Sequence, residues 1–373
     1  MSQDSGYTGT GAAREQAKLV AEVFTAIWDK HGGPAVLTAA DGGDYPAGLW
    51  DRLAEADLPW VSVPGEAGGS GGHLADGCAL WRAAGRAGCP LPIGETALAG
   101  WLLHAAGLTS PRAAMSVVPD PGALRLEEAG SGLTLTGAAT GVPWAADVEC
   151  LVALVPGPAG HWVVSLPPSE VTIRRRRNLA GEPRDAVTAK GVALAADRAA
   201  PAPGWLDPST FLQRGALLRV QQMAGAMNAA LARTIAYSSE RSQFGRPIGR
   251  FQAVADMIVR AVAEATLAIA AADVAAIALE DRGTADEVGC AKLIADEAAT
   301  VVAAHCHQAH GAIGMTQEYP LHHWTRRLWS WRAEFGSSDF WSRQVGTAVR
   351  SRGPDGLWPM VSADPRPASG GVA

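Results

Sequence analysis

The chain has 373 residues, of which 48% are hydrophobic and 18% are charged, and its formal net charge is -6. This length allows two or three domains with a large buried core. The mildly acidic balance argues against a general nucleic-acid or anionic-membrane binder, which would show a basic surface. No run approaches about 18 uninterrupted apolar residues, and the polar N-terminus lacks a signal-peptide core. We therefore expect no membrane span and a cytoplasmic location.

Neither the cysteines nor the histidines are spaced as a metal site or a disulfide framework requires. The five cysteines are odd in number, widely separated and without a CxxC pair. Histidines gather at 305–310 and at 322–323. His307 and His310 share a helical face, but no acid completes a ligand set. We expect no metal.

The first half of the chain changes from helical to β-type periodicity. Residues 1–108 show apolar side chains at three- and four-residue spacing, as in Val20, Phe24 and Ile27, which predicts an N-terminal helical domain. Residues 109–204 instead contain short β-type runs separated by Gly, Pro and Asp. These runs predict a small antiparallel β domain.

Residues 205–352 return to long, alanine-rich helical patterns. Asp207 before Pro208 is a strong helix start, with an acid at the N-cap and Pro at the first helical position. Long helices joined by short turns predict a C-terminal antiparallel four-helix bundle. The expected helices run from Pro208 to about Glu240, from Gln252 to Asp281, onward to His310, and from Leu321 to Arg350. Residues 353–373, rich in Pro, Gly and Ser, predict a disordered tail.

The turn between the first two bundle helices, residues 237–252, carries three arginines among turn-forming residues. Gly245, Pro247 and Gly249 favour a turn, because Gly tolerates positive φ and Pro removes a backbone donor. Arginines at such a turn are suited to holding an anion. An ordinary helix connector with solvated arginines would give the same composition.

Two motifs of the bundle carry a resemblance to a known family. One is Arg-x-Gln-Phe-Gly-x-Pro-Ile-x-x-Phe-Gln at 241–252, and the other is Gln-x-x-Gly-x-x-Gly at 308–314, followed by Glu-Tyr-Pro at 318–320. With the order helical domain, β domain and bundle, they resemble the acyl-CoA dehydrogenase family of flavoproteins over about residues 14–350. The stretches 49–53 and 64–72 are also similar to that family.

This resemblance implies FAD at a dimer interface within a tetramer, an acyl-CoA substrate and an electron-transfer acceptor. In the family, residues of the two motifs lie against the flavin nucleotide of the neighbouring subunit. Carried over, they are Arg241, Gln243, Phe244, Gln252, Gln308 and Gly311. Ser337, at the Thr of the family's Glu-Gly-Thr, is carried over as a further cofactor contact.

The resemblance fails at the catalytic base, the carboxylate that removes a proton beside the thioester carbonyl. Ungapped alignment from the Glu-Tyr-Pro stretch places Phe335 at that position, and Phe cannot accept a proton. Glu334 is one residue earlier and is the first candidate for a displaced base. The alternative base position of some members falls on Gly215.

Segments that serve a subunit's own flavin are also altered. The family's Thr-Glu-Pro-x-x-Gly-Ser segment is replaced near Val117–Gly122, and its Trp-Ile-Thr appears as Gly141-Val142-Pro143. Features that reach a neighbour's flavin remain, whereas those around the chain's own flavin are eroded.

Three functions stay open at this point. The chain is the base-lacking subunit of a heteromeric α2β2 dehydrogenase, as is known in this family for steroid side-chain degradation. Alternatively, it is a complete dehydrogenase, a homotetramer with Glu334 as the base. The third alternative is an acyl-CoA-dehydrogenase-like flavoprotein with other oxidative chemistry.

Overall fold

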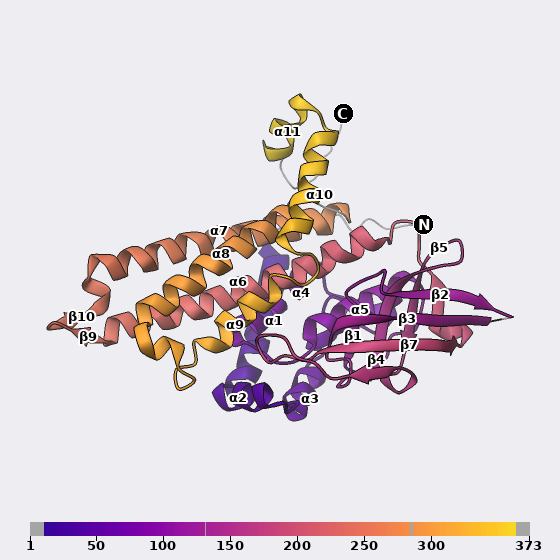
Figure 1. The fold of residues 1–373 in the computed structure, drawn as a ribbon, viewed down its shortest axis with the longest axis horizontal. Helices are drawn as coiled ribbons and strands as arrows, with labels where there is room; N and C mark the ends of the chain where they lie inside the picture. Colours follow the sequence, from indigo (N-terminus) through magenta and orange to yellow (C-terminus); the bar gives the residue numbers. More distant parts are fainter. Residues whose placement is uncertain (1–10, 131, 284–285, 363–373) are drawn as a thin grey trace.

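The computed structural model describes residues 11–130, 132–283 and 286–362 (Figure 1). It is mostly helical with a central β domain, which confirms the predicted fold class. The N-terminal helices wrap one side of the molecule and the long C-terminal helices extend away from the sheets. The N-terminal elements are α1 (Gly11–His31), α2 (Pro34–Gly42), α3 (Ala47–Glu55), η1 (Leu58–Trp60), η2 (Gly65–Ala67), α4 (Leu74–Ala87) and α5 (Ile93–Ala105).

The β domain consists of two four-stranded sheets, ordered β1-β4-β5-β8 and β2-β3-β7-β6. Its strands are β1 (Met115–Val117), β2 (Leu124–Ala129), β3 (Gly132–Pro143), β4 (Cys150–Gly157), β5 (Gly160–Leu166), β6 (Thr172–Arg174), β7 (Arg184–Leu194) and β8 (Ala199–Pro201). Strand β1 pairs with β4 in parallel, whereas the other pairs within these two sheets are antiparallel. The predicted antiparallel domain is therefore confirmed, with one parallel pair at its edge.

Three long helices form the main part of the bundle: α6 (Pro208–Glu240), α7 (Gln252–Arg282) and α8 (Asp286–His310). Helix α6 begins as the sequence predicts, because the backbone N–H of Thr210 donates to Oδ1 of Asp207 over 2.8 Å. Buried alanines line the helix contacts, and their small side chains let the backbones approach closely.

The predicted last bundle helix is in fact two helices, α9 (His322–Trp331) and α10 (Ser338–Ser351). Between them the chain turns, with Phe335 at φ 52° and Gly336 at φ 98°. Both angles lie in the left-handed region, which ends a helix. Ser337 then begins α10 as its N-cap, accepting a hydrogen bond from the Phe340 N–H at 3.4 Å. The period of apolar residues does not reveal this break.

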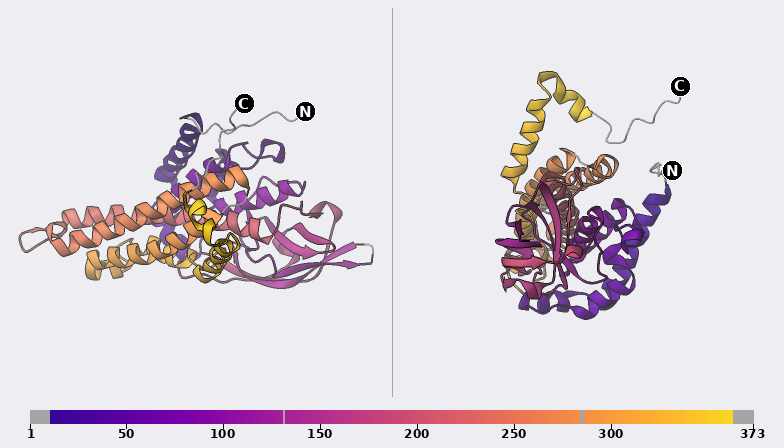
Figure 2. Two further views of the ribbon diagram at one scale, coloured as in Figure 1. Left: turned by 90° about the horizontal axis from the view of Figure 1, so that it is seen from above. Right: turned by 90° about the vertical axis from the view of Figure 1, so that its right-hand side faces the viewer.

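Helix α10 projects from the body and is followed by η7 (Pro354–Gly356) and α11 (Leu357–Ser362), as Figure 2 shows. The sequence predicts a disordered tail from residue 353, so these helical residues differ from that expectation. Apolar residues such as Leu357 and Trp358 supply the helical pattern that the abundance of Pro and Gly obscured. The rest of the predicted tail, 363–373, lies outside the described residues.

Helix α7 is long and apolar enough, by length and composition, to cross a membrane. It nevertheless packs along α8 and α6, and one of its faces is buried through alanines including Ala261, Ala268 and Ala275. This is the packing of a bundle helix.

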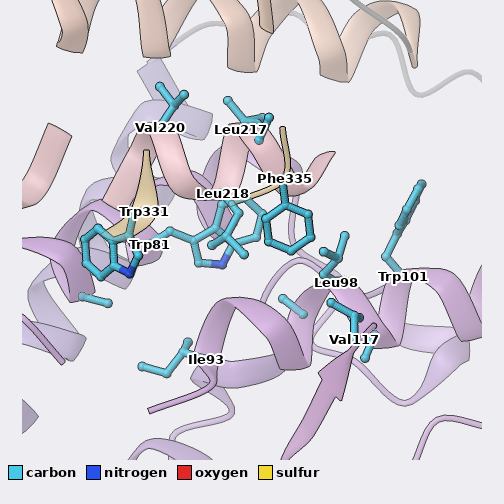
Figure 3. Close-up of a cluster of buried hydrophobic side chains, with 14 of the residues drawn as sticks. Trp81, Ile93, Leu98, Trp101, Val117, Leu217, Leu218, Val220, Trp331 and Phe335 are labelled. Carbon is cyan, nitrogen blue, oxygen red and sulfur yellow. The ribbon is translucent and has the colours of Figure 1, made fainter. Parts of the chain in front are cut away.

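Helix α5 lies where the three parts of the chain meet, and most of its side chains are buried. The Thr96 hydroxyl exchanges hydrogen bonds with the backbone N–H and C=O of Met115 in β1, each 3.1 Å long. On the other side, Leu98 belongs to the buried cluster that includes Leu217 of α6 and Phe335 (Figure 3). Phe335, the expected position of the catalytic base, lies at this junction.

Candidate functional site

The first motif forms a short hairpin at the far end of the bundle from the β domain (Figure 1). Its strands are β9 (Ser242–Gln243) and β10 (Arg246–Pro247), closed when Ile248 N–H donates to the Arg241 carbonyl over 2.8 Å. Phe244, at φ 52°, stands at the tip with 93% of its side chain exposed. An aromatic side chain so exposed offers a ring face to something outside the chain.

The other predicted hairpin residues are also accessible. Arg241, Gln243 and Gln252 are exposed, Gln252 as the first residue of α7. None of the three side chains makes a hydrogen bond or an ion pair with another of the described residues. The hairpin therefore presents a guanidinium and two amides together with the Phe244 ring.

The second motif ends α8 and continues into η6 (Gly311–Met315). Gly311 has φ 69°, and a Cβ added there would meet nothing within 4 Å, so the backbone is open to an approaching group. Gln308 is exposed and lies beside it. Both residues line an open groove with a volume of about 370 Å³. Its lining, which we call the Trp329 groove, consists of Ala303, Ala304, His307, Gln308, Gly311, Ala312, Met315 and Trp329.

An aromatic stack links the two motifs. The ring of Tyr237, just before the first motif, lies 4.6 Å from that of His310, with 20° between the planes. Tyr319, from the Glu-Tyr-Pro stretch, closes the group at 4.6 Å from His310 and 5.7 Å from Tyr237. Nδ1 of His310 also lies 2.7 Å from the Cys306 carbonyl oxygen. The stack therefore fixes the end of α8 against the end of α6.

The two base positions of the family face each other. A Cβ added to Gly215 would lie 2.1 Å from Cδ1 of Phe335. The Phe335 ring is 97% buried and meets the ring of Phe211 edge-on, with 6.0 Å between centroids. In Figure 3 it points into the apolar cluster near Leu98. A packed hydrocarbon ring thus occupies the place where a carboxylate is expected.

The Glu334 side chain lies between two arginines. Arg184 Nε and Arg219 Nε donate to its two carboxylate oxygens, each over 2.7 Å. Although burial opposes the charge, the two guanidinium groups and their hydrogen bonds lower the pKa of Glu334 to about 2. A carboxylate so stabilised as the anion is a weak proton acceptor. The assignment of Glu334 as a base stays a prediction, and this geometry does not favour it.

The arginines extend this ion pair into all three parts of the chain. Arg219 of α6 donates to Oε1 of Glu95 in α5 over 2.6 Å, and both side chains are almost completely buried. Arg184 of β7 donates to Oε2 of Glu182 over 3.0 Å. Glu182 in turn pairs with Arg327 of α9 at 3.2 Å. Buried charges joined in this way resist separation of the three parts, because breaking a pair leaves an unpaired buried charge.

The sequence reasoning missed this buried ion chain. One signal was present, because Arg219 interrupts an apolar run of α6 between Leu218 and Val220. A charged residue inside a buried stripe needs a partner. Its partners Glu95 and Glu334 are 124 and 115 residues away, so spacing along the chain does not identify them.

The eroded β-domain segments are partly buried. Val117 and Val142 are fully buried, and the Arg184 guanidinium lies 4.8 Å from the centroid of the Trp144 ring. Side chains of this chain therefore fill the surroundings of Val117 and Val142, whereas Asp120 and Gly122 lie at the surface.

One group among the described residues has side chains of the metal-ligand types. The ligand atoms of Asp41, His322 and His323 lie within 4.8 Å of one another. Asp41 already faces the ring of His323 at 3.2 Å and the guanidinium of Arg326 at 3.9 Å. Protein groups therefore account for its charge, and the expectation of no metal stays a prediction.

The hairpin and the Trp329 groove suit FAD better than the region around Phe335 does. The exposed hairpin and the groove beside Gly311 offer a guanidinium, an aromatic face and open backbone to a nucleotide reaching in from outside. The region around Phe335 is packed.

Comparisons with known proteins identify the family of the chain. Residues 14–113 match a family model described as "Acyl-CoA dehydrogenase, N-terminal domain", and residues 203–349 match one described as "Acyl-CoA dehydrogenase, C-terminal domain". The chain is 28% identical over 319 residues to "Acyl-CoA dehydrogenase IpdE2" of Mycobacterium tuberculosis, an alignment that covers 84% of this chain and 91% of that protein.

Two solved structures share the fold. The ChsE4-ChsE5 complex from Mycobacterium tuberculosis includes a chain similar to this one with a TM-score of 0.83 and 21% identity, covering 93% of this chain and 99% of that one. A chain of the structure titled "Tcur3481-Tcur3483 steroid ACAD G363A variant" matches with a TM-score of 0.82 and 23% identity, covering 91% and 99%.

Proposed function

The chain belongs to the acyl-CoA dehydrogenase family of oxidoreductases, and we propose that it is the subunit without a catalytic base in a heteromeric member. In this proposal a homologous sister chain supplies the base and the ring environment of the flavin. This chain contributes the hairpin and the Trp329 groove to the same cofactor. The assembly has the α2β2 form and acts on an acyl-CoA thioester.

The contact between Phe335 and Gly215 is the observation that carries the proposal. Both family positions for the base lie in this one contact, and neither residue can accept a proton. A substituted carboxylate there would enter an apolar cluster that includes Phe211 and Leu98. The Arg219 guanidinium lies 5.5 Å from the centroid of the Phe335 ring, but it already pairs with Glu95 and Glu334. A carboxylate at this place would have to compete with these two partners in an otherwise apolar surrounding, so the packing disfavours a base here.

The residues carried over as cofactor contacts support the proposed contribution of the hairpin and the Trp329 groove to FAD binding. When bound, FAD supplies the acceptor for the hydride that leaves the substrate's β-carbon. Arg241 would hold the pyrophosphate by charge-assisted hydrogen bonds, and Phe244 would cover a ring of the nucleotide. Gln308 and the open backbone at Gly311 would contact the same cofactor from the second motif. These side chains bind and orient, and none of them is a proton acceptor.

The partner and the substrate class are inferred from the structural relatives. The ChsE4-ChsE5 structure is a complex of two differently named chains, and the Tcur3481-Tcur3483 structure carries the description "steroid ACAD". We propose a sister chain of the same family for this protein, a steroid-derived acyl-CoA as its substrate, and an electron-transfer protein as its acceptor.

The test is to purify the chain alone and together with each family member encoded beside it, and then to count flavins per tetramer. We expect little flavin and no acyl-CoA oxidation from the chain alone, and both from a heterotetramer. Arg241→Ala should lower the flavin content of the complex, whereas Arg174→Ala, an exposed arginine of β6, should not. A chain that forms an active, fully flavinated homotetramer by itself would refute the proposal.

The displaced-base alternative rests on the position of Glu334 next to the family's base position. It predicts that Glu334→Gln abolishes acyl-CoA oxidation while flavin stays bound. Under our proposal, the same variant lowers stability and leaves the chemistry to the sister chain. Other oxidative chemistry would appear as rapid reaction of the reduced flavin with O2 in the absence of an acyl-CoA substrate.

A further inference from the structure

We infer that the buried ion pair of Lys292 and Asp296 in α8 positions Phe335, because it holds together the two sides of the turn that carries this residue. We call this pair the α8 clamp. The clamp keeps the Phe335 ring over Gly215 and so keeps the base region of this chain closed. The inference rests on the proposed function in one respect, that Phe335 stands in place of the catalytic base.

The two residues of the α8 clamp form an ion pair inside the protein. Lys292 and Asp296 are one helical turn apart, and both side chains are almost completely buried. Lys292 Nζ donates to Oδ1 of Asp296 over 2.8 Å. Burial lowers the pKa of Lys292 and raises the pKa of Asp296, so each charge is costly without the other. Apolar residues at these two positions would avoid that cost, which indicates that the charges serve more than the stability of α8 itself.

The other hydrogen bonds of the α8 clamp go to both sides of the turn between α9 and α10. Lys292 Nζ donates to the carbonyl oxygen of Arg332, before the turn, over 2.6 Å. The Ser338 hydroxyl, after the turn, donates to Oδ2 of Asp296 over 2.8 Å. The Arg332 guanidinium also interacts electrostatically with Asp296. One turn of α8 thus holds the chain on either side of Phe335.

The conformation of this turn depends on contacts from outside it. Phe335 has φ 52°, which is unfavourable for a residue with a bulky side chain. Its carbonyl oxygen accepts a hydrogen bond from the Trp341 indole N–H over 3.0 Å. Gly289 of α8 lies against that indole, since an added Cβ would be 3.0 Å from its Cε3 atom. Strained backbone persists only where the surrounding contacts impose it, and α8 supplies such contacts here. In this conformation the Phe335 ring points into the buried cluster of Figure 3.

Amide hydrogen exchange of the full chain, followed by mass spectrometry, tests the inference. The backbone N–H groups of Arg332, Glu334 and Trp341 are hydrogen-bonded, so their exchange reports opening of the turn. Lys292→Met keeps the apolar stem but removes the donors. It should speed exchange of these amides about tenfold, as expected for one or two lost hydrogen bonds. Lys18→Met, in an exposed pair of the same i,i+4 spacing on α1, should leave their exchange unchanged.

A double variant separates positioning from overall stability. Lys292→Met with Asp296→Leu replaces both charges by apolar groups, so it should recover most of the unfolding free energy that Lys292→Met loses. The hydrogen bonds to Arg332 and Ser338 are still missing, so exchange in the turn should stay fast. A contribution to overall stability alone would instead make exchange and stability recover together. Wild-type exchange in the turn of either variant would overturn the inference.

The space above Gly215 gives a second readout. If the α8 clamp holds the Phe335 ring in place, the ring can give way to an added methyl group only when the clamp is absent. Gly215→Ala should therefore destabilise the double variant less than it destabilises the wild type in denaturant unfolding. Equal losses in the two backgrounds would show that the clamp does not position the ring, and would also overturn the inference.

Failure of this inference can be told apart from failure of the proposed function. The exchange and unfolding measurements need neither flavin nor a partner chain. If the clamp variants behave as the wild type while Arg241→Ala lowers the flavin content of the heteromeric complex, only the inference is wrong. If the chain alone forms an active, fully flavinated homotetramer, the proposed function is wrong, whatever the exchange in the turn.

Discussion

The ring of Phe335 occupies the space that any side chain at position 215 would need, since a Cβ on Gly215 would lie only 2.1 Å from its Cδ1 atom. Gly215 lies within α6 and Phe335 in the turn between α9 and α10, so the contact joins distant segments of the bundle. In folded proteins a Cβ atom essentially never lies within 3.0 Å of another such heavy atom. The two positions are therefore coupled, and neither can change size alone.

Gly215→Ala should destabilise the protein, although alanine is the better helix former by up to about 1 kcal/mol. The Phe335 ring is buried and packed against Phe211, so it cannot move aside freely. We expect a net loss of about 1–3 kcal/mol in the free energy of unfolding, as for other overpacked cores. Denaturant unfolding of the purified variant measures this loss.

Two further variants make that result specific. Gly48→Ala, in the exposed part of α3 where an added Cβ meets nothing within 4 Å, should be neutral or stabilising. The double variant Gly215→Ala with Phe335→Leu should lose less than the sum of the single losses, because the smaller side chain leaves room. Strict additivity would mean that the two residues do not compete for space.

The sequence predicted the order of the three domains, the long bundle helices and the two exposed motifs, because these depend on local patterns. Apolar spacing indicates α6, and the Asp207-Pro208 pair marks its start. The turn around Gly245 is indicated by Gly245, Pro247 and Gly249, because Gly and Pro favour turns in most sequence contexts. For these features a few neighbouring residues carry the information.

The packing around Phe335 and the ion pairs of Glu334 could not be predicted in the same way. The resemblance places Phe335 at the expected position of the base, but it does not indicate that the ring fills the space above Gly215. The apolar pattern also predicts a continuous helix through Glu334, whereas the left-handed residues Phe335 and Gly336 break it. Whether Glu334 meets Arg184 and Arg219 depends on packing between domains, and no local pattern encodes that.

Acid should lower the free energy of unfolding, because it protonates Glu334. The pKa of Glu334 is lowered from the ordinary 4.5 to about 2 in the folded protein. Between these two pH values the carboxylate therefore stays charged in the folded protein but becomes protonated in the unfolded chain. The associated stability is fully present above pH 4.5 and is lost as the pH falls toward 2. A shift of this size corresponds to about 3 kcal/mol at neutral pH. Urea unfolding of the wild type and Glu334→Gln at pH 7 and at pH 3.5 tests it.

The variant should already be less stable at pH 7, by about 3–5 kcal/mol, because Arg184 and Arg219 lose a buried partner charge. Its stability should also vary less with acid than that of the wild type. Glu297→Gln, an exposed glutamate on α8, is the matched control and should follow the wild type. A Glu334→Gln protein with wild-type stability at pH 7 would contradict the ion-pair account.

The Trp331 side chain should report on the same ion chain, because its indole N–H donates to Oε2 of Glu182 over 2.9 Å. Trp331→Phe keeps most of the buried ring but removes the donor, so we expect a loss of about 1–2 kcal/mol. Trp341 also donates from a buried indole, but to the backbone carbonyl of Phe335. Comparison of Trp331→Phe with Trp331→Leu by thermal unfolding separates the lost hydrogen bond from lost packing, since both variants lose the indole N–H but leucine leaves the larger cavity.

Mild acid should loosen the junction of the two motifs through His310. Burial lowers the pKa of His310, and the neighbouring His307 acts in the same direction. A histidine kept neutral in the fold is protonated more readily in the unfolded chain, so stability falls as the pH drops below about 6.5. His310→Phe keeps a ring between Tyr237 and Tyr319 but cannot be protonated. Its unfolding free energy should therefore change less between pH 7.5 and pH 5.5 than that of the wild type.

A residual slope is expected in His310→Phe, because the pKa values of His307 and His322 are lowered by burial as well. His310→Leu separates stacking from titration: it should show the same reduced slope but lower stability at pH 7.5, since it removes the ring that joins Tyr237 to Tyr319. If His310→Phe and the wild type keep parallel pH profiles, the proton on His310 has no part in holding the end of α8 against α6, and packing alone fixes the two motifs.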